Sequence, residues 1–358
     1  MKEPNGSTNK PEQRAPVAGM NAADISQPSG LFAGQARSMN ALMWTVVIGL
    51  FPGIVTNVYF FGIGVLLQIS CAIAVVVVTD EAVAKFHNQT QGTSAWDGTA
   101  VVLALIVAIS IPPYSPWWIC AIASIVANIF GKHIYGGTGQ NLFNPAMVGV
   151  AFALVCFPTL SSYWPNANAI GQMSSVDIFR TFFSLKANFP DAVSGATLLE
   201  FERTQISNAM MRGEFSHSQQ YGVLAERGWQ WVNLAYLGGG LMLCIRRVIP
   251  WTIPITLLGT LFVIAMVFNS LDEQRYAGPV FQCFSGAVIV AAFFVATDPV
   301  SSPVGQRALI MYAALIACLV FIFRHLGSYP DGVAFAVLLA NAVVPLLDKL
   351  CSRQIYGH

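Results

Sequence analysis

Long apolar stretches separated by short polar segments dominate this chain between residues 41 and 350. Stretches of this length with few charged positions are typical of helices that cross the hydrocarbon core of a bilayer. The pattern predicts an all-α polytopic membrane protein with about ten transmembrane helices. Several stretches are short for a core about 30 Å thick, which predicts tilted or interrupted helices. The predicted helices span residues 41–57, 59–84, 97–112, 116–131, 145–160, 229–245, 250–270, 279–296, 307–323 and 332–350.

Three polar segments flank or separate these stretches. Residues 1–38 are rich in Gly, Pro, Asn, Ser and Gln and contain no apolar run, which predicts a disordered tail and not a signal peptide. Residues 161–227 form a long connection, and residues 351–358 form a short C-terminal segment. The chain is therefore expected to contain two five-helix membrane regions, 39–160 and 228–350, joined by the long connection.

Basic residues predict how the chain is oriented in the membrane. If the N-terminus lies in the cytoplasm and the helices alternate, most Lys and Arg residues of the short connections lie inside, as the positive-inside rule requires. Among the short connections, only those with Arg275 and Arg324 then place basic side chains outside. Both termini are predicted to be cytoplasmic, and residues 161–227 are predicted to be extracytoplasmic.

The two membrane regions resemble each other in sequence. Residues 97–108 (DGTAVVLALIVA) match residues 285–296 (SGAVIVAAFFVA) in size and polarity at nearly every position, and GVAFA at 149–153 recurs at 332–336. The likeness favours a duplicated five-helix unit, although low-complexity apolar sequence can imitate a repeat. Because five is odd, the second copy is expected to be inverted in the membrane. Sites in such folds lie near the midplane, where helices are broken.

Composition agrees with the membrane prediction and excludes several other classes of protein. Hydrophobic residues make up 55% of the 358 residues, charged residues make up 10%, and the mean hydropathy is +0.60. Soluble domains carry about 25% charged residues. A formal net charge of +1 gives no reason to expect nucleic acid as a partner. The seven cysteines include no C-x-x-C pair, and no two histidines face each other in mid-membrane, so no metal, cluster or haem site is predicted.

The connection between the fourth and fifth predicted helices, HIYGGTGQNLFNPAMVG at 133–149, combines glycines with two asparagines. The glycines allow tight backbone geometry, and Asn141 and Asn144 offer paired hydrogen-bond donors and acceptors. Pro145 is suited to the first turn of the helix that follows. Such a cluster beside apolar helices suits a flat ligand that forms hydrogen bonds. The alternative is a turn that satisfies its own backbone.

Three aspartates lie at the ends of predicted helices. Asp298 follows Thr297 in FFVATDPVSSP (293–303), and a carboxylate costs about 2.5–3.5 kcal/mol at the membrane centre. Asp298 is therefore expected either to face protein, ligand or water, or to cap a helix at the interface. Asp97 and Asp331 are candidate helix caps as well. For all three residues, coupling to a transported ion is the alternative.

The long connection contains the string DAVSGATLLE at 191–200. Its small residues predict an exposed turn with two hydroxyl groups, on Ser194 and Thr197, separated by Gly195 and Ala196. The chemistry of these residues alone indicates an ordinary turn that a modifying enzyme could reach.

The motifs together resemble those of a known family. DAVSGAT resembles the flavinylation motif D-x-x-S/T-G-A-T. With YGGTGQNLFNPAM, FFVATDPVSSP and SYPDGVAFAVLLANAVVPLLD, the chain from about residue 39 to its end resembles the D subunits (RnfD) of the bacterial Rnf complexes. Those complexes are ion-translocating ferredoxin:NAD⁺ oxidoreductases of the inner membrane. The related B subunits (NqrB) of the sodium-pumping NADH:quinone reductases share the fold and the threonine motif.

The resemblance implies a component of a redox-driven translocase that relays electrons and is coupled to Na⁺ or H⁺ transport. FMN would be joined through its phosphate to Thr197, within the motif residues Ser194, Gly195 and Ala196, by a periplasmic flavin transferase. The implied partners are the A, B, C, E and G subunits of the Rnf complex and the lipid bilayer, and no catalytic residue is predicted in this chain. A non-covalent riboflavin is also implied. Its candidate contacts are Asn141, Asn144, Thr297 and Asp298.

Two alternative functions stay open for the sequence. The B component of an NADH:quinone reductase is distinguished by whether NADH alone drives quinone reduction in the assembled complex. A passive solute channel is the second alternative, because five-helix inverted repeats also build channels. A channel has no need of the string DAVSGAT.

Overall fold

A computed structural model of the chain describes most of the region in which helices are predicted. The predicted tail, residues 1–38, and residues 352–358 of the predicted C-terminal segment lie outside the described residues. The described residues are 39–86, 97–162, 164–165, 174–184, 194–195, 197–207, 222–327, 329 and 331–351.

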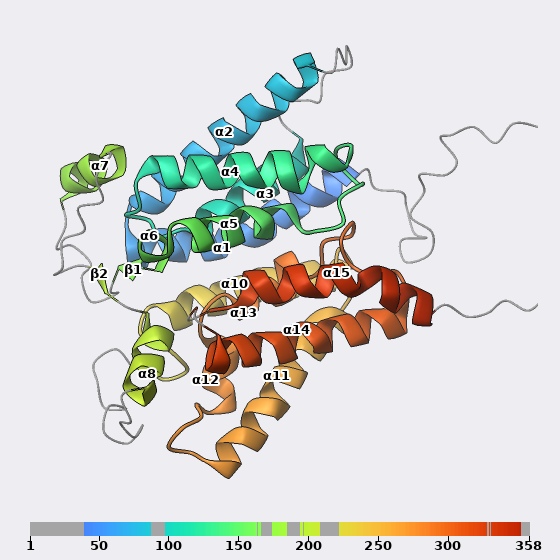
Figure 1. Cartoon of the computed structure of the whole chain (residues 1–358). Helices are drawn as coiled ribbons and strands as arrows, with labels where there is room; N and C mark the ends of the chain where they lie inside the picture. Colours follow the sequence, from blue (N-terminus) through green and yellow to red (C-terminus); the bar gives the residue numbers. More distant parts are fainter. Residues whose placement is uncertain are drawn as a thin grey trace, which may run out of the picture. The chain divides into compact units, whose positions relative to one another are not determined.

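Every apolar stretch that predicts a helix contains one in the structure (Figure 1). The first half is formed by α1 (Met39–Phe61), α2 (Gly64–Phe86), α3 (Gly98–Ile109), α4 (Trp117–Gly131), η2 (His133–Tyr135), α5 (Pro145–Cys156) and α6 (Pro158–Ser162). The second half is formed by α10 (Trp229–Ile245), α11 (Thr252–Leu271), α12 (Pro279–Phe284), α13 (Val288–Val290), η4 (Ala291–Val295), α14 (Gln306–Leu326) and α15 (Val333–Cys351).

Six of the described helical segments are long and apolar enough to cross a membrane. They are α1, α2, α4 with η2, α11, α14 and α15. Helices α3 and α5 are apolar but have only 12 residues each. The chain is a multi-pass membrane protein, and of the roughly ten predicted spans, length and composition support six among the described residues.

The prediction of one continuous helix over residues 279–296 is wrong. Helix α12 ends at Phe284, and the chain continues through Gly286 into α13 and the π-helical turn η4. Gly286 has a φ angle of +63°, a backbone conformation that glycine adopts without steric cost. The Asn233 side chain on α10 donates to the carbonyl oxygens of Phe284, at 2.6 Å, and Gly286, at 3.2 Å. The interruption is therefore held by hydrogen bonds from a neighbouring helix.

Several helix contacts occur in a similar order in the two halves. In the first half, α1 and α2 pack on α3, α2 packs on α4, and α4 packs on α5. In the second half, α10 and α11 pack on the segment formed by α12, α13 and η4, α11 packs on α14, and α14 packs on α15. The halves meet where α1 contacts α10 and where α5 contacts α15 (Figure 1). The interrupted segment thus packs on α10 and α11, as α3 packs on α1 and α2.

Small residues allow α1 and α10 to approach closely. A Cβ atom added to Gly239 of α10 would overlap the carbonyl oxygen of Gly49 on α1. A Cβ atom on Gly53 of α1 would overlap the ring of Tyr236 on α10. Glycine at such crossings lets two helix backbones come into contact inside a membrane.

Gly239→Ala is expected to destabilise the contact between the two halves. The added methyl group meets a backbone atom that cannot rotate away, so we expect a loss of about 1–3 kcal/mol. Gly238→Ala is the matched control, because its Cβ atom would have nothing within 4 Å. The measurement is the thermal unfolding midpoint of each purified variant in detergent, and equal midpoints would contradict the prediction.

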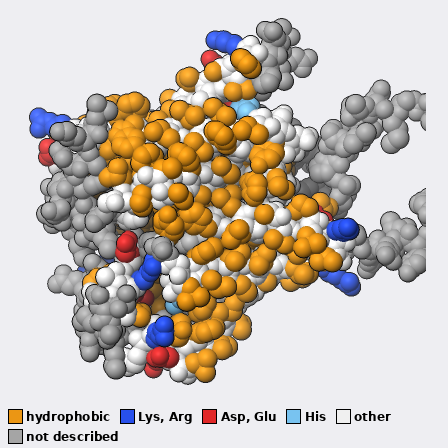
Figure 2. Space-filling view, viewed as in Figure 1, with side chains coloured by type: hydrophobic (Ala, Val, Ile, Leu, Met, Phe, Trp, Pro, Cys, Tyr) orange, Lys and Arg blue, Asp and Glu red, His pale blue; other side chains and the backbone are white. Residues whose placement is uncertain are grey.

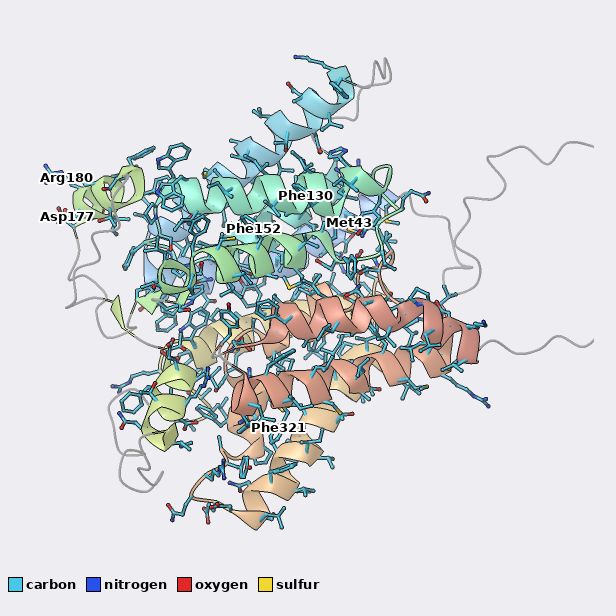
Figure 3. The ribbon with its side chains drawn as sticks, in the orientation of Figure 1. Met43, Phe130, Phe152, Asp177, Arg180 and Phe321 are labelled. Atoms are coloured by element: carbon cyan, nitrogen blue, oxygen red, sulfur yellow. The ribbon has the colours of Figure 1, made fainter. Side chains whose placement is uncertain are left out.

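The outer surface of the helices is apolar. Figure 2 shows hydrophobic side chains over most of one face, with Lys, Arg, Asp and Glu side chains toward its margins. Phe130 on α4 and Phe152 on α5, labelled in Figure 3, are among the exposed aromatic side chains. An apolar surface of this extent is expected where lipid replaces water as the solvent.

The long connection has secondary structure of its own. It contains α7 (Ser175–Phe183), α8 (Leu198–Ser207) and the strands β1 (Trp164–Pro165) and β2 (Ser194–Gly195). The strands pair antiparallel, with Trp164 opposite Gly195. Asp177 and Arg180 lie on the side of α7 that is turned away from the helices (Figure 3). All four elements lie at the end of the helices opposite to the end where α15 finishes (Figure 1).

Candidate functional site

A cavity of about 140 Å³ lies between the two halves of the chain. This volume is roughly ten times the space that a single buried water molecule needs. Its walls come from α1, α5 and α10, from α13 and η4, from the start of α15, and from the long connection. The interruption of the helix at Gly286 opens directly onto it.

Thr197 lies in the wall of this cavity, at the N-terminus of α8. Its Oγ1 accepts a hydrogen bond from the Glu200 amide at 3.4 Å, and its carbonyl oxygen accepts one from the Phe201 amide at 2.8 Å. These contacts are those of a helix N-cap residue, and the sequence T-x-x-E matches the capping box pattern. The side chain is partly buried. The expected exposed turn is therefore an ordered helix start at Thr197.

The residue after Thr197 anchors this helix start to the second half. The Leu198 side chain is buried and packs against Ala225, Ala277 and Phe281. The Leu198 amide donates to Glu226 Oε2 at 3.0 Å. Pairing of β2 with β1 holds the preceding residues against the end of the first half. Thr197 is thus positioned from both halves of the chain.

Glu226 lines the cavity beside Thr197. Burial raises the pKa of its carboxyl group to about 7, and the hydrogen bond from the Leu198 amide opposes this shift without cancelling it. Between about pH 4.5 and 7, the folded chain therefore keeps a proton that the unfolded chain has released. The stability of the fold is expected to fall as pH rises through this window.

Glu226→Gln is expected to remove this pH dependence. The Gln side chain has no proton to lose and still offers an oxygen to the Leu198 amide. The free energy of unfolding of the variant, relative to that of the original chain, is therefore expected to increase as pH rises from about 5 to about 8. The gain at the upper end is expected to be on the order of 2–3 kcal/mol. Thermal midpoints measured across this range test it, with Glu273→Gln, at an exposed position, as the control. A difference in thermal midpoint between the variant and the original chain that does not change with pH would contradict the prediction.

Three buried polar atoms at the cavity wall form no hydrogen bond of good geometry with another described residue. They are Asn57 Oδ1 on α1, and Trp229 Nε1 and the Tyr236 hydroxyl on α10. The Asn57 and Tyr236 side chains lie close enough to interact with each other. Asn57 and Tyr236 are each 2% exposed. Buried polar groups without a partner are rare in folded proteins, and a bound ligand or water is one usual explanation. The cavity therefore offers both donors and acceptors to a molecule bound inside it.

Aromatic side chains form the wall of the cavity near Thr197. The Trp229 ring contacts the Trp164 ring edge to face, with ring centroids 4.9 Å apart, and contacts the Phe61 ring with centroids 4.6 Å apart. Trp164 and Trp229 both line the cavity. Aromatic walls with a few polar groups are typical of sites for flat organic ligands.

Arg324 holds the interrupted helix from behind the cavity wall. Its Nη1 donates to the Gln282 carbonyl oxygen at 2.6 Å, and its Nη2 donates to the Ser285 carbonyl oxygen at 2.7 Å and to Asp331 Oδ1 at 3.3 Å. Asp331 Oδ2 accepts from the Ala287 amide at 2.6 Å. Helix α14 continues beyond the predicted end at residue 323, so Arg324 lies in the helix and not in the connection that follows it. The side chain belongs to the last turn of α14, is 2% exposed, and satisfies carbonyl groups that the helix break releases.

The asparagine motif and the Thr297 segment meet across the two halves. Asn144 caps α5 by accepting from the Met147 amide at 3.2 Å, and its Nδ2 donates to the Val295 carbonyl oxygen at 3.3 Å. Met147 and Val295 line the cavity. Thr297 Oγ1 donates to the Phe293 carbonyl oxygen at 2.7 Å.

The other residues named from the sequence have partners within the chain. Asn141 Nδ2 donates to the Phe143 carbonyl oxygen, and Asp298 Oδ2 accepts from the Ser301 hydroxyl. Neither these two residues nor Asn144 and Thr297 belong to the cavity wall described above. Asp97 caps α3 by accepting from the Thr99 amide and hydroxyl, as its helix-cap interpretation predicts. Ser194 and Gly195 form β2, and Ala196 lies outside the described residues.

Sequence reasoning missed most of the residues that line this cavity. Asn57 and Tyr236 lie inside apolar stretches, where a polar side chain is costly and therefore a signal of function. Glu226 and Trp229 lie at or just before the start of the sixth predicted helix. Polar and aromatic residues are expected at such a membrane interface, so these two did not stand out. Arg324 could also have been noticed, because a basic residue on the side predicted to be outside is an exception to the positive-inside rule.

Comparison with known proteins shows what the chain is similar to. A sequence model of the NQR2, RnfD, RnfE family matches residues 27–357. The chain is 40% identical over 338 residues to a protein of Vibrio atlanticus named as the D component of an ion-translocating oxidoreductase complex, with 91% of this chain and 97% of that protein covered. Proteins with the same name from Shewanella amazonensis and Pseudomonas aeruginosa are 39% and 37% identical, covering 89% and 93% of this chain and 94% and 96% of their own lengths.

Proposed function

The chain belongs to the NQR2, RnfD, RnfE family, and we propose that it is the flavin-carrying D component of an ion-translocating oxidoreductase complex. Its role in that complex is to relay electrons between reduced ferredoxin and NAD⁺, coupled to transport of Na⁺ or H⁺. The names of the relatives support a redox-driven translocase, and they favour the Rnf complex over a quinone reductase.

Thr197 is the proposed point of attachment for FMN, through a phosphate ester to Oγ1. The hydroxyl lies at the N-terminus of a ten-residue helix, where free amide groups and the helix dipole favour a phosphate. The Glu200 amide, which donates to Oγ1, is in place to donate to the ester. Ser194, Gly195 and Ala196 complete the motif that a flavin transferase would recognise.

The cavity beside Thr197 is the proposed binding place for the ring system of this flavin. Its apolar and aromatic walls suit a flat ring, and the unpartnered atoms of Asn57, Trp229 and Tyr236 suit the ring's hydrogen-bonding edge. The buried Trp229 Nε1, which has no partner among the described residues and belongs to the aromatic wall of the cavity, is the observation that carries the proposal. When bound, a flavin supplies one- and two-electron transfer, while the protein supplies position and electrostatics.

Asn141, Asn144, Thr297 and Asp298 remain the proposed contacts of a second, non-covalent riboflavin. The hydrogen bond from Asn144 to Val295 supports a shared site, because it joins the two motifs next to a residue that lines the cavity. Asp97, Asp298 and Asp331 remain candidates for the ion path. The hydrogen bonds of Asp97 and Asp331 to backbone groups favour structural roles for those two residues.

We also propose that the two halves are inverted repeats in a bacterial inner membrane. The shared order of helix neighbours supports the repeat, and the interrupted helix beside the cavity is a feature of such folds. With both termini in the cytoplasm, Thr197 lies on the periplasmic side, where a flavin transferase can reach it. The A, B, C, E and G subunits of the complex are the proposed partners.

Mass spectrometry of one tryptic peptide tests the attachment directly. Cleavage after Lys186 and Arg203 releases residues 187–203, which contain the whole motif. After co-expression with a flavin transferase, we expect this peptide to carry the mass of FMN less one water, with fragment ions that locate the adduct on Thr197. An unmodified peptide from such a preparation would refute covalent attachment.

A further inference from the structure

The short helix α7 in the long connection has sides of different character. Asp177 and Arg180 form a charged side that is turned away from the other helices (Figure 3). Ile178 and Phe182 form a second side, and both of these side chains are buried. A helix of nine residues is not stable in water by itself, so packing of its apolar residues must hold α7 in place.

A third side of α7 is apolar and exposed. It consists of Val176, Phe179 and Phe183, which follow one another at spacings of three and four residues and so share one face of the helix. Their exposed fractions are 56%, 41% and 62%. Single exposed apolar side chains are common on protein surfaces, but three on one face of a short helix form a patch that marks an interaction surface.

Helix α7 lies at the rim of the apolar outer surface of the membrane helices. It packs on α2, close to the turn between α1 and α2. A Cβ atom added to Gly62 in this turn would lie 3.7 Å from Ile178 Cδ1 and 3.8 Å from the hydroxyl oxygen of Tyr114, which precedes α4. Leu66, in the first turn of α2, is exposed and belongs to the apolar outer surface. The exposed apolar side of α7 is therefore next to a surface that lipid covers.

Tryptophan side chains place this end of the helices at the level of the bilayer interface. Trp117, the first residue of α4, is exposed, and so is Trp231 in the first turn of α10. Helix α10 begins beside the end of α1, because the Trp229 ring contacts the Phe61 ring. Tryptophan is enriched where the hydrocarbon core meets the lipid headgroups. Helix α7, at the same end of the molecule, is thus at the depth of this boundary (Figure 1).

We propose that α7 lies in the interface of the bilayer, with Val176, Phe179 and Phe183 inserted among the lipids and with Asp177 and Arg180 in water. Amphipathic helices bind membrane surfaces in this way, with the apolar side about 5–10 Å deep at the boundary between headgroups and acyl chains. The helix lies between β1 and β2 in sequence, so it ties the long connection to the membrane surface. The proposal rests on the multi-pass membrane fold and does not depend on flavin attachment.

The test measures quenching of a fluorescent side chain on α7 in the full chain. The chain is placed in nanodiscs of phosphatidylcholine and phosphatidylglycerol, because both faces of the bilayer are then open to solutes. A coumarin amino acid replaces Phe179 by codon suppression, and in the matched control it replaces Arg180, the next residue of the same helix. Lipids with a nitroxide group on the upper part of the acyl chain are expected to quench the probe at position 179 strongly and the probe at position 180 weakly. Iodide is expected to quench the probe at position 180 several-fold more than the probe at position 179.

Two results of this experiment would overturn the proposal. The first is equal quenching of both positions by iodide, without quenching of position 179 by the nitroxide lipids, which would show that this side of α7 faces water. The second is strong iodide quenching at position 179 in the isolated chain that disappears in the assembled complex. That result would show that a partner subunit, and not lipid, covers Phe179.

A measurement without any substitution decides the question if the probe prevents folding. The original chain is placed in nanodiscs that contain phosphatidylcholine with a diazirine group in its acyl chain, and the sample is illuminated. Cleavage after Arg180 and Lys186 then releases residues 181–186, which contain Phe183. A lipid adduct that fragment ions locate on Phe183 supports the proposal, and a peptide free of lipid overturns it.

Discussion

Thr197→Ala is expected to abolish the flavin fluorescence of the denatured protein in a gel. A phosphate ester needs a side-chain hydroxyl, and alanine has none, so the expected loss is complete. Removal of the hydroxyl also deletes the N-cap of α8, at a cost of about 0.5–2 kcal/mol. The measurement is fluorescence of the band under ultraviolet light after co-expression with a flavin transferase, normalised to the amount of protein.

Two further variants separate attachment from folding. Thr197→Ser keeps a hydroxyl and a good N-cap, so it is expected to restore fluorescence at least in part. Thr204→Ala removes an exposed hydroxyl from the same helix and is expected to leave fluorescence unchanged. A fluorescent band in Thr197→Ala would place the flavin on another residue. Loss of fluorescence in Thr204→Ala would show that damage to α8 alone accounts for the effect.

Arg324→Met is expected to be among the most destabilising single substitutions in the second half. It removes donors from two backbone carbonyl groups at the helix break and leaves Asp331 without its ion-pair partner. Loss of one member of a fully buried ion pair costs about 3–5 kcal/mol, and because the Asp331 carboxylate is 22% exposed we expect a loss near the lower end of this range. Methionine keeps much of the side-chain volume, so the effect reports on charge and hydrogen bonding more than on packing.

The yield of monodisperse protein and its thermal midpoint measure this effect. Arg275→Met is the matched control, because Arg275 is exposed and its guanidinium lies 5.8 Å from the centroid of the Tyr276 ring. We expect the control to behave like the original chain. If Arg324→Met were as stable as the control, the arginine would not be what holds the interrupted helix.

Arg324 also links the helix break to the proposed flavin site. Gly286, Ala287 and Asp331 line the cavity, and the hydrogen bonds of Arg324 and Asp331 fix the backbone at this point. Gly286 cannot be replaced without strain, because its φ angle is +63° and a Cβ atom would overlap the Asp331 carboxylate. The shape of the cavity on this side is therefore set by one glycine and by the ion pair between Arg324 and Asp331.

The positions of the helices could be predicted from the order of residues alone. Apolar stretches report local hydropathy, and a helix satisfies its own backbone hydrogen bonds, so helix positions follow without knowledge of the neighbours. The Asp97 cap is equally local, because the aspartate and its partner Thr99 are two residues apart. The string DAVSGAT consists of seven consecutive residues, and so its resemblance to a modification motif is visible without a fold.

The surroundings of Thr197, in contrast, depend on contacts between distant parts of the chain. Asn57 and Tyr236 line the same cavity from helices that are far apart in sequence. The segment around Thr197 is held by β1, which comes before it in the long connection, and by Glu226, which comes after it. The break at Gly286 was likewise invisible, because the partners that stabilise it lie on α10 and α14. A pattern of hydrophobic positions records which residues avoid water. It does not record which distant side chains provide hydrogen bonds to a carbonyl group released by a broken helix.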